Sequence, residues 1–160
     1  MRARLALIGP GVLLAGAALA QSAPADPAPD GASLYGRCSA CHTASGAGLP
    51  GAFPPLNRDV RMMAAKPAGR RYLALVVRLG LIGPLEVEGQ TYRNVMPAQS
   101  GLDDAAIAAV LNHVGTRISH DGPAFRAFTA AEVAGYTADA GKTSAAELAA
   151  LHASLAKGGA

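Results

Sequence analysis

Apolar residues recur with helical spacing in two stretches of the chain. From Pro67 to Leu79 they stand at positions i, i+3, i+4 and i+7, on one face of a helix ended by Gly80. From Asp103 to Ser119 they fall within a stripe of about 100°, and acidic residues occupy the first turn, where the helix dipole favours them. The pattern therefore predicts two amphipathic helices that pack against a common core.

Shorter elements surround these helices. Residues 31–37 predict a short helix whose large apolar side chains are Leu34 and Tyr35. Residues 45–56 are too rich in glycine and proline for regular structure and predict a loop. Residues 87–92 predict a small hairpin that turns at Glu88 and Gly89.

The last forty residues carry two capping-box sequences, Thr129 to Glu132 and Ser144 to Glu147, each of which opens a short alanine-rich helix. The last helix has one apolar seam, formed by Leu148, Leu151 and Leu155. We expect this seam to dock either on the preceding domain or on a partner.

The chain begins with a short basic segment, an apolar run from Leu5 to Leu19 and small residues suited to signal peptidase. Residues 1–20 are interpreted as a cleaved signal peptide. The alternative is a retained membrane anchor, but the run is shorter than the roughly 20 residues that span a bilayer. We expect a Pro/Ala linker at 21–30, one domain at 31–119 and a C-terminal helical extension at 120–160.

Composition adds two points. Alanine inflates the hydrophobic share of 51%, and there is no tryptophan, so a large apolar cofactor would supply core surface that the side chains lack. Cleavage after residue 20 would remove Arg2 and Arg4 and leave a mature chain near +1. The charge therefore gives no reason to expect nucleic acid or a membrane surface as a partner.

The run from Cys38 to His42 has the form Cys-x-x-Cys-His, the sequence form of covalent haem attachment. Two thiols on one side of a helical turn can each form a thioether with one vinyl group of a porphyrin, and His42 can then bind the iron. A thioredoxin-like pair would need a βαβ setting, a zinc site would need four ligands, and a disulfide would leave His42 unexplained. Haem c belongs to an extracytoplasmic compartment, which agrees with the export signal and predicts a periplasmic protein.

A second iron ligand is expected on the opposite face of the haem. Met96 precedes Pro97, which disfavours helix and places the thioether on extended backbone, and it follows His42 by 54 residues. Met62 and Met63 are competitors, and a core methionine is the structural alternative for Met96. Pro54 or Pro55 is the candidate to accept a hydrogen bond from the second ring nitrogen of His42.

The other histidines and the basic residues have less specific readings. His113 lies at the edge of its helix stripe and is expected to pack beside the first helix, the alternative being a ligand or proton-linked site. His120 and His152 are expected at the surface. The segment from Arg58 to Arg78 carries six cations and one acidic residue, and is either a docking surface for acidic partners or a solvated helix face.

Taken together, the haem-attachment motif, the Gly/Pro loop, the middle helix, the segment from Tyr92 to Pro97 and the helix at 103–119 resemble the class I c-type cytochromes. The resemblance implies an all-α cytochrome c fold, with three to five helices around one covalent haem c and an extra C-terminal helical tail. It implies thioethers at Cys38 and Cys41, with His42 and Met96 as iron ligands. His113 stands where an aromatic residue often packs in the family, at the crossing of the first and last helices.

More narrowly, the pattern is similar to the single-haem cytochromes that accompany periplasmic dehydrogenases. That similarity implies an electron-transfer protein rather than an enzyme, with a dehydrogenase as donor and a terminal oxidase or another cytochrome of the respiratory chain as acceptor. Two alternatives remain. One is a haem enzyme with an open iron site, such as a peroxidase, and the other is a haem-based sensor or assembly module.

Overall fold

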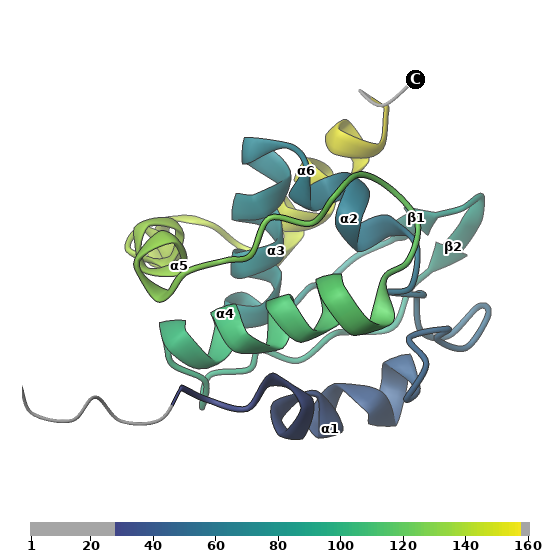
Figure 1. The fold of residues 1–160 in the computed structure, drawn as a ribbon. Helices are drawn as coiled ribbons and strands as arrows, with labels where there is room; N and C mark the ends of the chain where they lie inside the picture. Colours follow the sequence, from purple (N-terminus) through teal and green to yellow (C-terminus); the bar gives the residue numbers. More distant parts are fainter. Residues whose placement is uncertain (1–27, 158–160) are drawn as a thin grey trace, which may run out of the picture.

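The computed structural model describes residues 28–157, so the predicted signal peptide and most of the predicted linker lie outside the described residues. The described part is mostly helical and has one small sheet (Figure 1). Its elements are α1 (Gly31–His42), α2 (Asp59–Ala64), α3 (Pro67–Leu79), β1 (Leu85–Val87), β2 (Gln90–Tyr92), α4 (Asp104–His113), α5 (Ala130–Thr137) and α6 (Ala145–Lys157). Among these residues, no helix has the length and apolar character needed to cross a membrane.

Helices α1 and α4 pack against each other at close range (Figure 1). The side chain of Asp30 caps α1 by accepting hydrogen bonds from the first backbone N–H groups. Gly31 lies directly against the carbonyl of Ala109, so any larger residue there would push the helices apart. The ring of His113 packs on the ring of Tyr35, with centroids 5.4 Å apart, which confirms that His113 lies beside the first helix.

The helix predicted to end at Ser119 changes at its end into a π-helical turn over Val114–Ile118. In a continuous α-helix the carbonyl of Gly115 would accept from Ser119, but Ser119 N–H donates to Val114 instead, at 2.7 Å. The Gly115 carbonyl accepts from Nε of Arg61 at 2.8 Å. The wider turn thus frees a carbonyl for a contact with α2, and the periodicity of the sequence holds no sign of it.

The predicted hairpin is present. β1 and β2 pair antiparallel, with Leu85 opposite Tyr92. Glu88 and Gly89 form the turn with φ of 53° and 77°, the left-handed values that a two-residue type I′ hairpin requires. Leu85, Val87 and Tyr92 from the two strands face the same cavity as α3, so the hairpin forms one of its walls.

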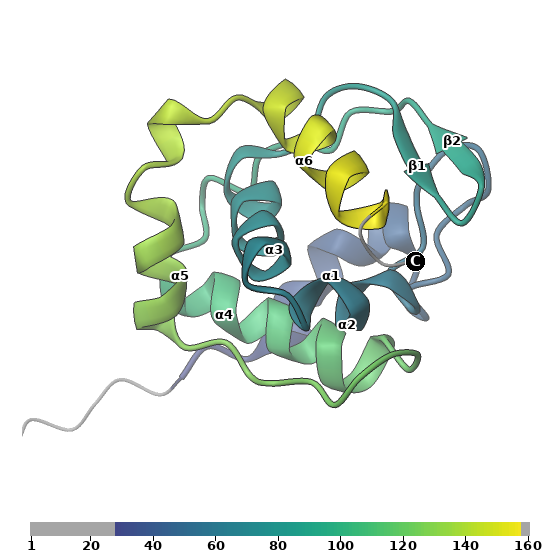
Figure 2. The same ribbon diagram turned by 90° about the horizontal axis from the view of Figure 1, so that it is seen from above.

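The C-terminal tail docks on the domain itself. α3 lies between α5 and α6, and α6 also contacts β1 (Figure 2). Val133 of α5 and Leu148 of α6 are both completely buried. Burial of two such side chains contributes several kcal/mol, about 1.5–3 kcal/mol each. The tail and the domain therefore share one core.

Candidate functional site

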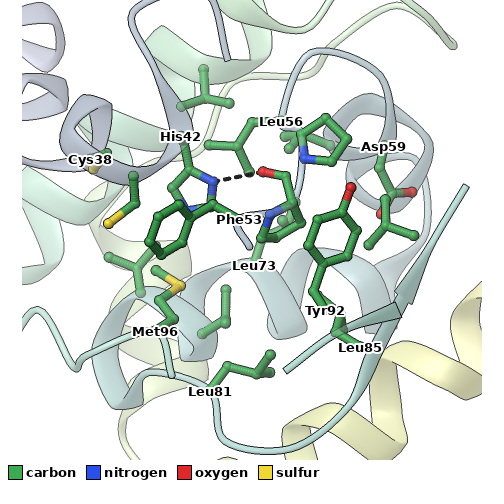
Figure 3. Close-up of a pocket in the computed structure, with 18 of the residues that line it drawn as sticks. Cys38, His42, Phe53, Leu56, Asp59, Leu73, Leu81, Leu85, Tyr92 and Met96 are labelled. Carbon is green, nitrogen blue, oxygen red and sulfur yellow. Dashed lines mark hydrogen bonds between the residues drawn. The ribbon is translucent and has the colours of Figure 1, made fainter. Parts of the chain in front are cut away.

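A cavity enclosing about 1310 Å³ of space, part of it open to solvent, lies between α1, α3, α4 and the hairpin. Its walls are mainly apolar. The four predicted site residues all line it: Cys38, Cys41, His42 and Met96. Cys38 and His42 enter from α1 and Met96 from the segment after the hairpin, and all three face the same space (Figure 3).

The imidazole of His42 is held in one tautomer. Its Nδ1 lies 2.9 Å from the carbonyl oxygen of Pro54, and because a carbonyl only accepts, Nδ1 must carry the hydrogen and donate it. Nε2 is then left with a lone pair to offer a metal. Burial lowers the pKa of His42, although the bond to Pro54 opposes this, so the ring is neutral at neutral pH. Of the two prolines proposed as its partner, Pro54 is confirmed.

The loop that carries Pro54 is shaped to approach His42. The N–H of Gly48 donates to the His42 carbonyl at 3.0 Å. Gly48 has φ of 65°, and its backbone lies directly against Pro54, where a side chain would collide with the proline carbonyl. The glycines of the Gly/Pro loop therefore permit the close chain reversal that brings the carbonyl to the imidazole.

Cys38 and Cys41 are half-buried and not joined to each other. Burial raises the pKa of Cys38, whereas a redox-active pair depends on a thiol whose pKa is lowered. Among the described residues, no three His, Cys, Asp or Glu side chains gather as a zinc site would require. Both thiols do face a large apolar cavity from one turn of α1, as attachment to a porphyrin needs.

Met96 is fixed by a backbone bridge. Its N–H donates to Leu81 at 3.0 Å and its carbonyl accepts from Leu81 at 2.9 Å, just after the end of α3. Gly80, with φ of 74°, lies against the Met96 carbonyl where no side chain would fit. The extended backbone predicted at Met96 is confirmed, and the bridge explains how the side chain is aimed into the cavity.

The two competing methionines differ from each other. Met62 is 45% exposed and does not line the cavity. Met63 is 5% exposed and does line it, from α2. Geometry therefore removes Met62 as an iron ligand but leaves Met63 as a second thioether at the cavity.

Comparison with known proteins agrees with this geometry. The family model for cytochrome c matches residues 28–117. The chain belongs to the cytochrome c family. It is similar to a cytochrome c-552 of Thermus thermophilus, with 46% identity over 124 residues, which is 76% of this chain and 79% of the relative. A second Thermus thermophilus cytochrome c-552 is 47% identical over 106 residues, 65% of this chain and 81% of the relative.

Membership makes the chain a class I single-haem c-type cytochrome with one covalent haem c, and its function is haem-based electron transfer. Cys38 and Cys41 fit the Cys-x-x-Cys-His attachment motif. When bound, the haem supplies iron that cycles between Fe(II) and Fe(III). The polypeptide of this cytochrome contributes mainly apolar walls and holds His42 and Met96 in place through the carbonyl of Pro54 and the backbone of Leu81.

The cytochrome also has a polar end to its cavity that sequence reasoning missed. Asp59, Tyr72, Tyr92 and His152 line it. Asp59 and Tyr92 lie on the opposite side of the cavity from Cys38 (Figure 3). His152 was expected at the surface, which is wrong: it is 3% exposed, because docking of α6 covers it. No local signal distinguishes it from His120, which is exposed as expected.

The cations of the basic segment from Arg58 to Arg78 bind groups of the same chain. Nitrogens of all six cations hydrogen-bond to other parts of the cytochrome: Arg58 to Asp121, Arg61 to Gly115 and His120, Lys66 to Leu155, Arg70 to Arg126, Ala127 and Glu132, Arg71 to Thr143, and Arg78 to Leu102 and Asp104. Most of these partners belong to the tail. The segment serves mainly to bind the cytochrome's own C-terminal residues.

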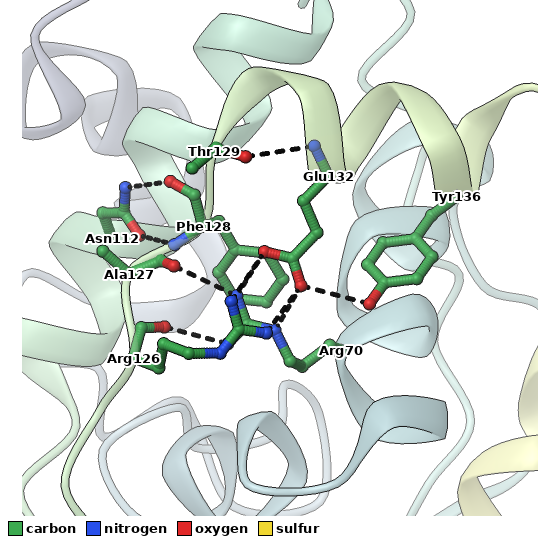
Figure 4. Close-up of polar contacts among 8 residues, drawn as sticks. All are labelled: Arg70, Asn112, Arg126, Ala127, Phe128, Thr129, Glu132 and Tyr136. Carbon is green, nitrogen blue, oxygen red and sulfur yellow. Dashed lines mark hydrogen bonds and ion pairs between the residues drawn. The ribbon is translucent and has the colours of Figure 1, made fainter.

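Arg70 shows this most clearly, because its side chain is only 3% exposed (Figure 4). Its guanidinium donates to both carboxylate oxygens of Glu132 at 2.6 and 2.7 Å, and to the carbonyls of Arg126 and Ala127 at 2.8 and 3.2 Å. Its Cζ lies 3.7 Å from the ring centroid of Phe128. For Arg70 the docking-surface prediction is wrong, since tail residues cover the guanidinium.

The same contacts predict a pH dependence of stability. The pKa of Glu132 falls from an ordinary 4.5 to about 2, first because Arg70 donates to its carboxylate. A lowered folded pKa stabilises the fold above the unfolded pKa, and this contribution is lost as pH falls from about 4.5 through 2. We expect the free energy of unfolding, measured with urea at pH 2 to 5, to fall less steeply in E132Q than in the parent.

Glu147 offers a matched control, because both glutamates follow the N-cap residue of their helix by three positions, at N3. The N–H of Ser144 donates to Glu147 at 2.6 Å, and Glu147 N–H donates to the Ser144 hydroxyl at 3.2 Å. Glu147 is fully exposed and has no arginine partner within residues 28–157, so E147Q should change the pH dependence of the free energy of unfolding less than E132Q does. If the free energy of unfolding falls equally steeply with pH in the parent and in E132Q, the role given to Arg70 is contradicted.

Proposed function

We propose that this cytochrome is a periplasmic one-electron carrier in which Cys38 and Cys41 hold the haem and His42 and Met96 are its axial ligands. The observation that carries the proposal is that all four side chains line one cavity although His42 and Met96 are 54 residues apart in the chain. A His/Met pair raises the reduction potential and leaves no open coordination site. Electron transfer without substrate binding at iron follows.

The proposed cellular setting follows from the sequence. Residues 1–20 would be removed as a signal peptide, and residues 21–30 would form a linker before the haem domain. The haem domain would comprise residues 31–119, followed by the tail at residues 120–160. No stable membrane anchor would remain. A periplasmic dehydrogenase is the proposed donor, and a terminal oxidase or another cytochrome of the respiratory chain the acceptor.

A small apolar area next to Met96 supports brief docking of such partners. Ile82 is 55% exposed and Val95 58% exposed, and they are the neighbours of the bridged pair Leu81 and Met96. Exposed apolar side chains beside a cofactor cavity suit a partner that binds weakly and leaves quickly. The area is small, which fits a transient electron-transfer contact.

The test replaces each cavity methionine separately. In M96L we expect loss of the iron-to-methionine charge-transfer band, a lower reduction potential and carbon monoxide binding to the reduced form. M63L removes the competing sulfur. It should keep the parental charge-transfer band and reduction potential, and its reduced form should not bind carbon monoxide. A band that survives in M96L would contradict the ligand assignment. Ready carbon monoxide binding by the parent would instead favour the haem enzyme with an open iron site.

A further inference from the structure

His152 of α6 lies outside the residues matched by the family model and yet lines the haem cavity. Its Nε2 is 3.3 Å from Oδ2 of Asp59, and its ring centroid is 5.4 Å from that of Tyr72. Its Nδ1 is buried and has no hydrogen-bond partner among the described residues. Burying a polar nitrogen without a hydrogen-bond partner costs free energy, so we expect a group outside the polypeptide to bind this atom.

Two tyrosine side chains also line the cavity. Tyr72 and Tyr92 are 5% and 6% exposed, and both line the cavity. Within the part of the chain that the structure describes, neither hydroxyl makes a hydrogen bond, unlike those of Tyr35 and Tyr136. Burial raises the pKa of Tyr72, so its hydroxyl stays protonated and can donate. One end of the cavity therefore offers several donors that have no acceptor.

The chemistry of haem c supplies the acceptor. Its thioether-forming edge and its two propionate carboxylates lie on opposite sides of the porphyrin. Cys38 anchors the first edge, and the polar end of the cavity is on the other side (Figure 3). A carboxylate in apolar surroundings needs hydrogen-bond donors, and charged donors bind it most strongly.

We propose that α6 completes the haem site, with Nδ1 of His152 donating to a haem propionate while Asp59 orients the ring from Nε2. Tyr72 and Tyr92 are the accompanying neutral donors. The inference rests on haem attachment at Cys38 and Cys41, as proposed above. It makes His152 a positioning residue for the cofactor, supplied by a segment beyond the family domain.

The number of protons on the His152 ring follows from its two proposed acceptors, Asp59 and the propionate. An ionised carboxylate only accepts, and neutral imidazole has one N–H, so it can donate to Asp59 or to the propionate but not to both. Only imidazolium serves both at once. A positive charge beside the haem favours Fe(II) over Fe(III), so replacing His152 with an uncharged side chain should lower the reduction potential.

Other titratable groups surround the ring and also affect the reduction potential. Asp59 faces it from α2 and Tyr72 from α3, and the outer groove next to it is lined by Arg58, Glu86, Glu88 and Asp121. Replacing His152 alone leaves all of these groups in place, so a change in the reduction potential can be assigned to the imidazole.

The experiment compares H152F with H113F in the holoprotein. His113 is a matched control, because its ring also packs on a tyrosine with centroids 5.4 Å apart, yet it does not line the cavity. We expect H113F to keep the midpoint potential of the parent at neutral pH. In H152F the potential should be lower than that of the parent.

A second measurement needs no variant. In nitrogen-15 spectra of the reduced parent at neutral pH, both ring nitrogens of His152 should be protonated, with contacts to propionate methylene protons. A single protonated nitrogen without such contacts, or a parental midpoint potential in H152F, would overturn the inference and leave His152 a packing residue. Loss of covalent haem or of the methionine band in the parent would instead contradict the proposed function.

Discussion

Replacing Arg70 with methionine is expected to lower the free energy of unfolding by about 3–5 kcal/mol, the range for removing one partner of a buried ion pair. R70M would leave the Glu132 carboxylate and two backbone carbonyls without their main donor. Because the guanidinium joins α3 to the start of α5, α5 should loosen first. Urea unfolding and amide hydrogen exchange in α5 and α6 measure the two effects.

Arg126 is the control for that experiment. It also donates to Glu132, at 2.8 Å, but its side chain is 66% exposed. R126M should therefore lower the free energy of unfolding much less than R70M does, because water screens an exposed ion pair and replaces its hydrogen bonds. Combining R70M with E132L should recover much of the loss, since no unpaired carboxylate remains. Equal losses in R70M and R126M would contradict the importance of burial.

Replacing Gly80 with alanine is expected to displace Met96 from the iron. Gly80 has φ of 74°, and a side chain there would meet the carbonyl of Met96. The strain should lower the free energy of unfolding by about 1–3 kcal/mol. Because the bridge between Leu81 and Met96 must shift, G80A should also weaken the methionine charge-transfer band and admit carbon monoxide to the reduced iron.

Gly89 provides a control that separates backbone strain from displacement of Met96. It has φ of 77° at the tip of the hairpin, and a side chain there would meet no other atom. G89A should therefore show the loss of stability from a left-handed backbone but keep the parental spectrum. If G80A and G89A behave alike, the contact with Met96 does not control iron ligation.

Local signals in the sequence predicted the local structure well. The apolar periodicity predicted α3 and α4 but not the π-helical turn after α4, and the paired turn residues Glu88 and Gly89 predicted the hairpin. The attachment motif predicted which side chains of α1 face the cavity. Each of these features is encoded by residues within a few positions of one another, so a linear pattern contains the information.

Features that depend on distant partners could not be predicted in this way. Arg70 has the sequence context of a solvated cation, and only Glu132, 62 residues later, makes it a buried one. The position of His152 depends on how α6 docks, and the end of α4 depends on Arg61. The choice of Met96 over Met63 stays a prediction that rests on its loop context and on the family resemblance, because both sulfurs belong to residues that line the same cavity.

The breadth of the cavity wall has a consequence for biogenesis. Its lining extends from Tyr35 to His152, almost the whole described chain, and is mainly apolar. Without the porphyrin, these side chains would enclose water or collapse on one another, and the free energy that holds α6 against α3 would be reduced. Maturation and folding are therefore thermodynamically linked in this chain, because any group held only in the native cavity stabilises the native state.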